Sequence, residues 1–341
     1  MIVSSAPGRC GVIGNPTDLY GGSVISCSTL ERAYCTLSQS DLLILCVEDY
    51  SEMFDYKQEL KLDGSPLDIP KAILIYYNLT PDNFNFRLHA KSNIPERAGL
   101  AGSTALVIAV LGAVLSQLRI EMDPYTIAET ARKIEFGVMG ITCGYQDQHM
   151  AVFGGLNYMD FRGKEHLTQN IDEPYATVEP LQKFVNRLPI IVAHTGITRN
   201  SSSVHKSIRE RWMEGEREVI SSYERISQLA RLGKKAILNG DWQRLGSLMN
   251  ENHEIQRALG GSGEQNDILI EAALKSGAYG AKLAGAGKGG TIIALTLEPE
   301  KTVRALQEAG AERILWPQPD NGLTVETTWQ DRLNLNLVEN N

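Results

Sequence analysis

The segment from Asn93 to Leu118, NIPERAGLAGSTALVIAVLGAVLSQL, constrains the fold more than any other stretch of this chain. A proline-led turn leads into a loop rich in glycine and hydroxyl residues, and the loop leads directly into a long apolar helix. Unpaired N–H groups and the positive end of the helix dipole favour a bound phosphate. Gly99 and Gly102 let the backbone approach a ligand where a Cβ would collide. The segment predicts a phosphate-binding loop, although Ser103 or Thr104 could also be a simple N-cap.

Composition and charge exclude several classes of protein. The apolar run Ala105–Leu115 is too short to cross a membrane and predicts a helix buried on all sides. The 341 residues carry a net charge of −8, which disfavours a nucleic-acid partner. The N-terminus lacks the pattern of a signal peptide, and the five scattered cysteines form no CxxC, so neither a disulfide framework nor a zinc site is expected. We expect a cytoplasmic protein, monomeric or homodimeric, without nucleic-acid or membrane partners.

The order of predicted elements indicates an α+β protein of two domains. Strands are predicted at 1–5, 24–29 and 42–47, with a glycine-rich loop between the first two, and Ile73–Tyr77 is an apolar run of uncertain type. A helix is predicted from Pro124 to about Gly137, and the apolar, β-branched run Leu188–His194 is typical of a central strand. Later helices are predicted at 201–233, 241–259, 268–276 and 300–310, with strands at 291–297 and 313–316. We place the domain boundary near residue 190, which gives domains 1–189 and 190–341.

Three glycine-rich motifs occur in order along the chain. The first runs from Ala6 to Gly22, the second from Pro95 to Ala105, and the third from Lys282 to Gly290. Together they resemble the three signature motifs of the GHMP kinases, the family of galactokinase, homoserine kinase, mevalonate kinase and phosphomevalonate kinase. The resemblance covers almost the whole chain. It implies the two-domain fold of that family, with an S5-like α/β N-terminal domain that binds ATP and a ferredoxin-like α+β C-terminal domain.

Details of the motifs narrow the resemblance to kinases that act on an anomeric hydroxyl. The loop GLAGSTA at 99–105 is one residue longer than usual and is similar to that of plant glucuronokinases, as is GNPTDLYGG at 14–22. The stretches GYQDQ at 144–148 and FGGLN at 153–157 are also similar to bacterial heptose-phosphate kinases. Both relatives phosphorylate the anomeric hydroxyl of a sugar. Phosphoryl transfer to an alcohol needs a phosphate cradle, a magnesium ion, a positioned hydroxyl and charge stabilisation.

The resemblance assigns residues to the phosphate cradle and to magnesium. The ATP-binding residues that it implies are Pro95, Gly99, Leu100, Ala101, Gly102, Ser103, Thr104, Ala105, Gly285 and Gly287. Glu135 lies twelve residues before Asp147, which resembles the galactokinase spacing of metal-binding glutamate to catalytic aspartate. Ser103 or Thr104 would add a hydroxyl ligand, and the longer loop leaves that choice open. Glu135 could instead be a solvated residue on the last turn of its helix.

The resemblance also assigns the reacting centre. Asp147 would lie against the attacking hydroxyl and take or steer its proton, with Arg9 beside it to keep the carboxylate ionised and to supply positive charge. Asp18 matches the aspartate that grips sugar hydroxyls in galactokinase-like members, although Asn-Pro-x-Asp also forms turns. Arg199 precedes the helix N-terminus at 201–203, which could bind a carboxylate or phosphate on the substrate. The substrate residues are therefore predicted to be Asp18, Tyr20, Gly21, Gly144, Arg199 and Gly287.

We therefore predict an ATP- and magnesium-dependent sugar kinase that makes a sugar 1-phosphate, with glucuronic acid as the first substrate to try. A heptose phosphate is the second, and galactose or mevalonate remains an alternative because fold-level resemblance does not settle substrate. A non-catalytic sensor and an ATP-dependent decarboxylase share the architecture. The presence of Arg9, Glu135 and Asp147 argues against a sensor.

Overall fold

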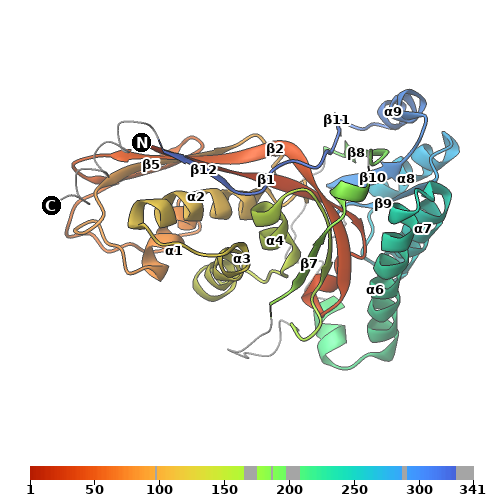
Figure 1. Ribbon diagram of the computed structural model, residues 1–341, viewed down its shortest axis with the longest axis horizontal. Coiled ribbons are helices and arrows are strands. Elements are labelled where there is room, and N and C mark those ends of the chain that lie inside the picture. The colour runs from red at the N-terminus through yellow and green to blue at the C-terminus, as the bar shows by residue number, and fades with distance from the viewer. Residues whose placement is uncertain (97, 165–174, 186, 197–207, 286–289, 328–341) are drawn as a thin grey trace.

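The computed structural model describes residues 1–96, 98–164, 175–185, 187–196, 208–285 and 290–327. Among these residues the chain forms two β-sheets with helices packed on them, and the predicted α+β class is confirmed (Figure 1). No helix in this part of the chain is long and apolar enough to span a bilayer.

The larger sheet has the path β12-β1-β2-β5-β3-β4, with β6 and β7 continuing from β2. Strand β2 is 17 residues long; it pairs with β1 along most of its length, and with β6 near its start and β5 near its end. All neighbours are antiparallel except β3 and β5. The strands are β1 (Ile2–Ile13), β2 (Ser23–Gln39), β3 (Leu43–Val47), β4 (Tyr50–Phe54), β5 (Phe86–Ser92), β6 (Leu156–Asp160), β7 (Thr177–Pro180) and β12 (Thr324–Thr327).

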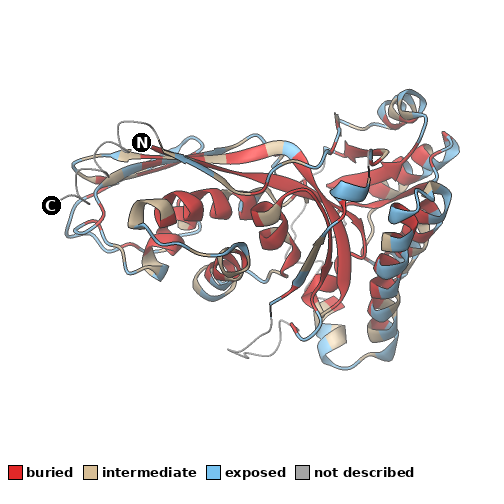
Figure 2. Cartoon of the chain, viewed as in Figure 1, coloured by how far each residue is buried: buried red, intermediate tan, exposed pale blue. Residues whose placement is uncertain are grey.

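Four helices lie along one side of this sheet (Figure 1). They are α1 (Asp68–Tyr76), α2 (Gly102–Leu118), α3 (Pro124–Lys133), which runs on into a π-helical turn at Ile134–Val138, and α4 (Gln146–Phe153). Helix α2 packs on β1 and β2 and is almost wholly buried, as its apolar sequence predicts (Figure 2). Asp123 caps α3 through the backbone N–H groups of Tyr125 and Thr126. Short 3-10 turns occupy Thr17–Leu19 and Gln182–Phe184.

The smaller sheet has the order β11-β8-β10-β9, and all of its pairs are antiparallel. Its strands are β8 (Ile190–His194), β9 (Gly280–Leu283), β10 (Thr291–Leu295) and β11 (Arg313–Leu315). The accompanying helices are α6 (Arg217–Leu238), α7 (Trp242–Ala258), α8 (Glu264–Lys275) and α9 (Pro299–Glu308). Helices α6 and α7 are amphipathic and run side by side, with exposed residues on their outer side (Figures 1 and 2).

Strand β12 brings the end of the described chain back to the first sheet, where it pairs with β1. Buried Arg32 fixes the approach to β12: its guanidinium donates to Asp320 Oδ2 at 2.9 Å and to the carbonyls of Asn321 and Gly322 at 2.7 and 2.6 Å. A boundary at residue 190 remains a proposal, and residues beyond it contribute to the first sheet through β12.

Two predicted elements differ from the structure. Gly8 and Gly11, predicted in a loop, lie inside β1, which runs to Ile13. The helix predicted over 201–233 is broken within its described part: one helix covers 208–213 and α6 starts at Arg217. Gly215 has a φ of +77° between them, and the N–H of Glu216 donates to the Arg211 carbonyl at 3.0 Å, which is a glycine-mediated helix end. The uncertain run 73–77 is the end of α1 together with its C-cap residue, Tyr77.

Candidate active site

The three glycine-rich motifs meet in space. The backbone N–H of Arg9 donates to the Leu100 carbonyl at 2.9 Å, which joins the first motif to the second. The N–H of Gly11 donates to the Ala284 carbonyl at 3.0 Å, which joins the first motif to the third. Thr291 Oγ1 donates to the Ala98 carbonyl at 2.5 Å, which links the strand after the third motif to the second.

The glycines in β1 permit this close approach. A Cβ at Gly8 would lie 2.8 Å from the Leu100 carbonyl oxygen, and one at Gly11 would lie 2.9 Å from the Ala284 carbonyl oxygen. Both distances are too short for a real Cβ, so any larger residue would push the neighbouring loop away. The glycine spacing in the first motif therefore reflects contacts between motifs.

Arg9 and Asp147 form an ion pair at this meeting point, as predicted. Arg9 Nε donates to Asp147 Oδ1 at 2.8 Å, and its Nη2 lies 2.6 Å from the same oxygen. Arg9 Nη1 donates to the Gly99 carbonyl at 2.6 Å, so one guanidinium holds both the carboxylate and the predicted phosphate-binding loop. Arg9 is buried, whereas 31% of the Asp147 side chain is exposed. Arg9 thus fixes the Asp147 carboxylate from the protein interior, while part of the aspartate side chain remains accessible to solvent.

The N-terminus of α2 has the features expected of a phosphate-binding loop. Gly99 has a φ of +77° and Ala101, the N-cap residue, has a φ of +60°. No side chain in the described part of the chain caps the helix, which leaves its first N–H groups to an anion. Pro95 begins the turn, with its carbonyl accepting from the Ala98 N–H at 3.4 Å, and the N–H of Ala105 donates to the Ala101 carbonyl at 2.9 Å. Gly102 is the first residue of the helix.

Glu135 lies next to Thr104. Thr104 Oγ1 donates to Glu135 Oε1 at 2.8 Å, and Gln148 Nε2 donates to Glu135 Oε2 at 2.5 Å. The glutamate is 2% exposed, so the alternative of a solvated helix-end residue is wrong. Burial raises the pKa of Glu135 to about 7, and hydrogen bonds from Gln148 and Thr104 oppose the rise. Ser103, in contrast, is exposed.

These side chains fit a magnesium ion in their chemistry. A carboxylate and a hydroxyl are hard oxygen donors, and Mg²⁺ completes its shell with water and phosphate oxygens. Gln148 Oε1 is buried and has no hydrogen-bond partner among the described residues, so a further oxygen is available beside Glu135. A cation here would also compensate the buried negative charge of Glu135. Among the described residues no three His, Cys, Asp or Glu side chains cluster, so the protein would supply few ligands.

Asp18 is buried at the N-terminus of α4. Its Oδ2 accepts from the backbone N–H groups of Tyr145 and Gln146 at 3.0 and 3.1 Å. Burial, with a further contribution from the Asp147 charge, raises the pKa of Asp18 to about 6. No hydrogen bond to Oδ1 occurs among the described residues, which leaves that oxygen to accept from a ligand. The interpretation of Asp18 as a turn residue is therefore incomplete, because its carboxylate also anchors the start of the helix that carries Asp147.

The surroundings of Asp18 include three of the predicted substrate residues, one of which, Tyr20, belongs to an aromatic stack. A Cβ at Gly144 would lie 2.0 Å from Asp18 Oδ2, so only glycine fits there. Tyr20 stacks on Tyr223 with ring centroids 4.6 Å apart and contacts Trp212 at 5.2 Å. Gly21 has a φ of +71° and completes the turn after Tyr20.

The third motif is described only in part. The Gly285 carbonyl accepts from Asn15 Nδ2 at 3.3 Å, and Asn15 Oδ1 accepts from buried Lys282 Nζ at 2.8 Å. Burial lowers the pKa of Lys282 to about 7. Gly287 and Arg199 lie outside the described residues.

Sequence reasoning did not select Asn15, Lys282, Gln146 or Gln148. All four are buried and bonded at the site, and Gln146 Oε1 accepts from Ser26 Oγ at 2.5 Å. The sequence could have indicated the two glutamines, because Gln146 and Gln148 flank Asp147 directly.

Models of known families match both parts of the chain. The model of the GHMP kinases N terminal domain matches residues 69–155, and that of the GHMP kinases C terminal region matches residues 234–313. The first includes the predicted phosphate-binding loop, Glu135 and Asp147.

Relatives from three organisms align over most of the chain. Probable glucuronokinase 2 of Arabidopsis thaliana is 31% identical and covers 88% of this chain and 86% of its own. The D-glycero-alpha-D-manno-heptose 7-phosphate kinase of Campylobacter jejuni is 28% identical over 92% of this chain and 94% of its own. A mevalonate kinase of Pyrococcus horikoshii is 33% identical and covers 95% of this chain and 98% of its own.

A solved structure shows the same fold. The D-glycero-D-manno-heptose 1-phosphate kinase from Bacteroides thetaiotaomicron superposes with a TM-score of 0.75 at 22% identity, covering 96% of this chain and all of that one. The resemblance drawn from the motifs is thereby confirmed. The chain belongs to the GHMP kinase family and is a phosphotransferase that acts on an alcohol group.

Proposed function

We propose that this chain is an ATP- and magnesium-dependent sugar kinase that phosphorylates an anomeric hydroxyl, with D-glucuronic acid as the first substrate to test. The observation that carries the proposal is the Arg9–Asp147 ion pair at the point where the three motifs meet. Partly exposed Asp147 directly follows the two backbone N–H groups that hold Asp18. The catalytic and the substrate carboxylate are therefore positioned by one helix N-terminus.

Asp147 is proposed to act on the attacking hydroxyl. The hydroxyl oxygen would form a bond to the γ-phosphorus of ATP while the bond from that phosphorus to the leaving ADP oxygen breaks. The hydroxyl proton would pass to an oxygen of Asp147 and from there to solvent. A carboxylate is a weak base, so its main contribution would be to orient the hydroxyl. Arg9 fixes the carboxylate by two contacts and keeps two of its five N–H donors for the transferring group.

The phosphate groups would lie against the N-terminus of α2. Gly99, Leu100, Ala101 and Gly102 bring backbone close to the anion, and the first N–H groups of the helix would bind it. Glu135 and Thr104 would hold magnesium, which neutralises phosphate charge when bound. Of the two candidate hydroxyls we favour Thr104, because it already contacts Glu135 and Ser103 is exposed.

Asp18 supports a polyhydroxylated substrate. With Oδ2 committed to two backbone donors, Oδ1 can accept a hydroxyl beside the reacting one. The relatives named as glucuronokinase and heptose-phosphate kinase agree with a sugar, and the glucuronokinase-like loop at 99–105 favours a uronic acid. A heptose phosphate is the second candidate, because the C. jejuni heptose 7-phosphate kinase is similar at 28% identity. Mevalonate, on the similarity to the P. horikoshii mevalonate kinase at 33% identity, and galactose complete the panel.

The experiment is a measurement of ADP release with ATP and magnesium against this panel, with CO₂ release measured in parallel. We expect ADP release with a sugar and no CO₂. If mevalonate were the best substrate, the proposal of a sugar substrate would be wrong. Release of CO₂ would indicate a decarboxylase. The absence of ADP with every compound would count against a kinase.

A further inference from the structure

The described helical residues 208–213 pack against the Asp18–Tyr20 turn. Trp212 contacts the Tyr20 ring, with centroids 5.2 Å apart, and Ile208 is buried in the same apolar cluster with Tyr223. Tyr20 is in turn stacked on Tyr223 of α6. These aromatic contacts fix the helix relative to the predicted substrate residues, so its polar side chains have defined positions beside the site.

Arg209 lies between the two apolar anchors of this helix, buried Ile208 and half-buried Trp212, and faces the loop before Asp147. Its Nη1 donates to Thr142 Oγ1 at 3.3 Å, and Thr142 lies between Glu135 and Gly144 in the chain. Arg209 is also close enough to Tyr20 for its charge to act on that hydroxyl. Burial raises the pKa of Tyr20, the Asp18 charge raises it further, and Arg209 opposes the rise. The guanidinium therefore lies in the electrostatic environment of the predicted sugar site.

Arg209 has no carboxylate partner among the described residues, and its one hydrogen bond there is the long one to Thr142. Nearby arginines differ: Arg9 is paired with Asp147, and Arg211, two residues along the helix, contacts Glu216 at 2.6 Å. Glu210 is the next residue, yet it is exposed and forms no ion pair with Arg209. An arginine presents five donors in a fork that matches a carboxylate or a phosphate.

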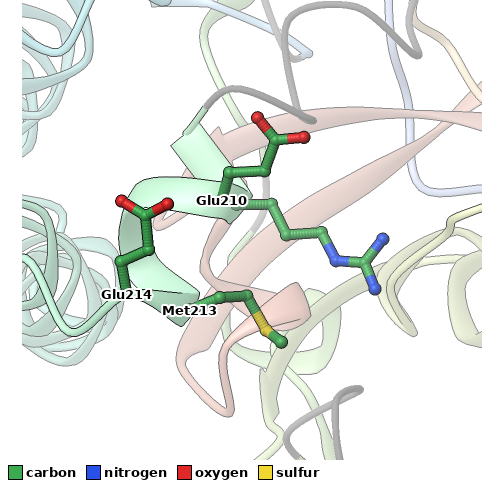
Figure 3. Close-up of a pocket in the computed structure, with 4 residues that line it drawn as sticks. Glu210, Met213 and Glu214 are labelled. Atoms are coloured by element: carbon green, nitrogen blue, oxygen red, sulfur yellow. The ribbon is translucent and has the colours of Figure 1, made fainter.

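A pocket of about 260 Å³ lies beside this arginine and is lined by Arg209, Glu210, Met213 and Glu214. In Figure 3 the Met213 side chain extends in a different direction from the carboxylates of Glu210 and Glu214. Both glutamates are exposed, so water and salt screen their repulsion of an anion. A water molecule takes up about 30 Å³, so the pocket has room for a charged substituent with its hydration.

We propose that Arg209 determines specificity by binding the anionic group of the sugar, a carboxylate or a phosphate. The proposal rests on the proposed function and makes that substrate an anionic sugar. Asp18 would accept from ring hydroxyls while Arg209, on the helix that covers the same turn, donates to the charged end. Glucose and other neutral sugars would lack the second contact.

The test compares kcat/KM of wild type, Arg209→Gln and Arg209→Lys with D-glucuronate, heptose 7-phosphate and the neutral sugars D-glucose and D-mannose. Arg211→Gln is the matched control, because it removes a positive charge from the same helix away from the pocket. For the preferred anionic sugar we expect Arg209→Gln to lose about 10- to 100-fold and Arg209→Lys to lose less, because a charge-assisted hydrogen bond is removed or weakened. Activity with neutral sugars should change by less than about threefold.

The outcomes separate this proposal from the proposed function. If wild type phosphorylates none of the sugars, the proposed function fails. If wild type is active and Arg209→Gln lowers kcat/KM equally for anionic and neutral sugars, Arg209 only supports the Thr142 loop and the inference is wrong. Thr142→Ala, which removes the hydroxyl partner, should leave the anionic preference intact; loss of the preference in that variant alone would also overturn it. Preference for glucuronate or for the heptose phosphate tells which anion the site takes.

Discussion

Substitution of Asp147 can distinguish an effect on proton transfer, read in kcat, from an effect on ATP and sugar binding, read in KM. Asp147→Asn keeps the shape of the side chain and removes the charge that accepts the proton. We expect kcat to fall about 10²- to 10⁴-fold while KM for ATP and sugar changes little. Because Arg9 is buried and loses its counter-ion, the free energy of unfolding should also fall, by about 1–3 kcal/mol. Steady-state kinetics well below the melting temperature measures the first effect.

The matched control is Glu251→Gln, which removes a carboxylate from the more exposed Arg225–Glu251 pair. It should leave kcat unchanged and cost little stability, because such surface pairs contribute about 0–1 kcal/mol. If Asp147→Asn kept kcat within a few-fold of wild type, the catalytic role of Asp147 would be wrong.

Glu135 makes stability depend on pH in a way that a metal ion should reverse. Its pKa is about 7 in the folded protein against 4.5 for the free side chain. Between these values the folded protein holds a proton that the unfolded chain has lost, so stability falls as pH rises through this window. Without divalent cations, wild type should lose up to about 3 kcal/mol relative to Glu135→Gln from pH 4.5 to pH 7. The raised pKa of Asp18 affects both proteins alike and cancels in the comparison.

Urea unfolding at several pH values, with EDTA and then with magnesium, tests this. Magnesium at pH 8 should stabilise wild type and leave Glu135→Gln unchanged. Parallel pH profiles for the two proteins, or equal stabilisation by magnesium, would show that Glu135 neither titrates in this range nor holds the metal.

At the residue scale, the sequence motifs predicted the Arg9–Asp147 pair and the neighbourhood of Glu135 and Thr104. They could not distinguish Thr104 from Ser103, because adjacent residues at a helix start differ in which way they face. Only the packed structure shows Thr104 directed at Glu135 and Ser103 exposed. The partners of buried Lys282 also depend on a contact with Asn15, 267 positions away.

The start of α4 positions Asp18 and Asp147, the two carboxylates proposed to act on the substrate, and Gly144 controls that arrangement. In Gly144→Ala the new Cβ would lie 2.0 Å from Asp18 Oδ2, so the carboxylate or the helix start must shift. We expect KM for the sugar to rise at least about tenfold and the melting temperature to fall, since Asp18 loses its backbone donors. KM for ATP should change less, because the α2 loop is untouched.

Gly137→Ala is the control for this change. Gly137 lies in the π-helical turn that follows α3, and a Cβ there would meet nothing within 4 Å. Its kinetics and melting temperature should match wild type. If Gly144→Ala behaved like Gly137→Ala, Asp18 would not depend on the start of α4.

Helices and strands with a strong hydrophobic pattern were predictable from the sequence, whereas tertiary contacts set the residues at which they begin and end. The apolar run in α2 predicts a buried helix, and the structure extends it to Gly102–Leu118. Glycines misled the prediction in β1, because Gly8 and Gly11 occur there for close contact between motifs and not for a turn. In the predicted helix at 201–233, Gly215 ends one described helix, and helical periodicity alone does not show that break.

At the scale of the whole molecule, the candidate site exists because distant segments are joined. Backbone contacts from Arg9 to Leu100 and from Gly11 to Ala284 connect motifs separated by up to 273 positions. The motif order in the sequence resembled that of a known family, and on that resemblance the meeting of the three motifs was predictable. The return of β12 to β1 and the placement of Arg209 beside Thr142 carry no local signal, because they depend on packing between elements.

The central claim is that the protein transfers the γ-phosphate of ATP to the anomeric hydroxyl of a sugar. Phosphorus NMR of the product formed from D-glucuronate, ATP and magnesium tests it most directly, because coupling of the phosphorus to the anomeric proton identifies the modified hydroxyl. We predict a sugar 1-phosphate that forms together with ADP and is absent with Asp147→Asn. A phosphate on any other hydroxyl, or a phosphorylated product only with mevalonate, would contradict the claim.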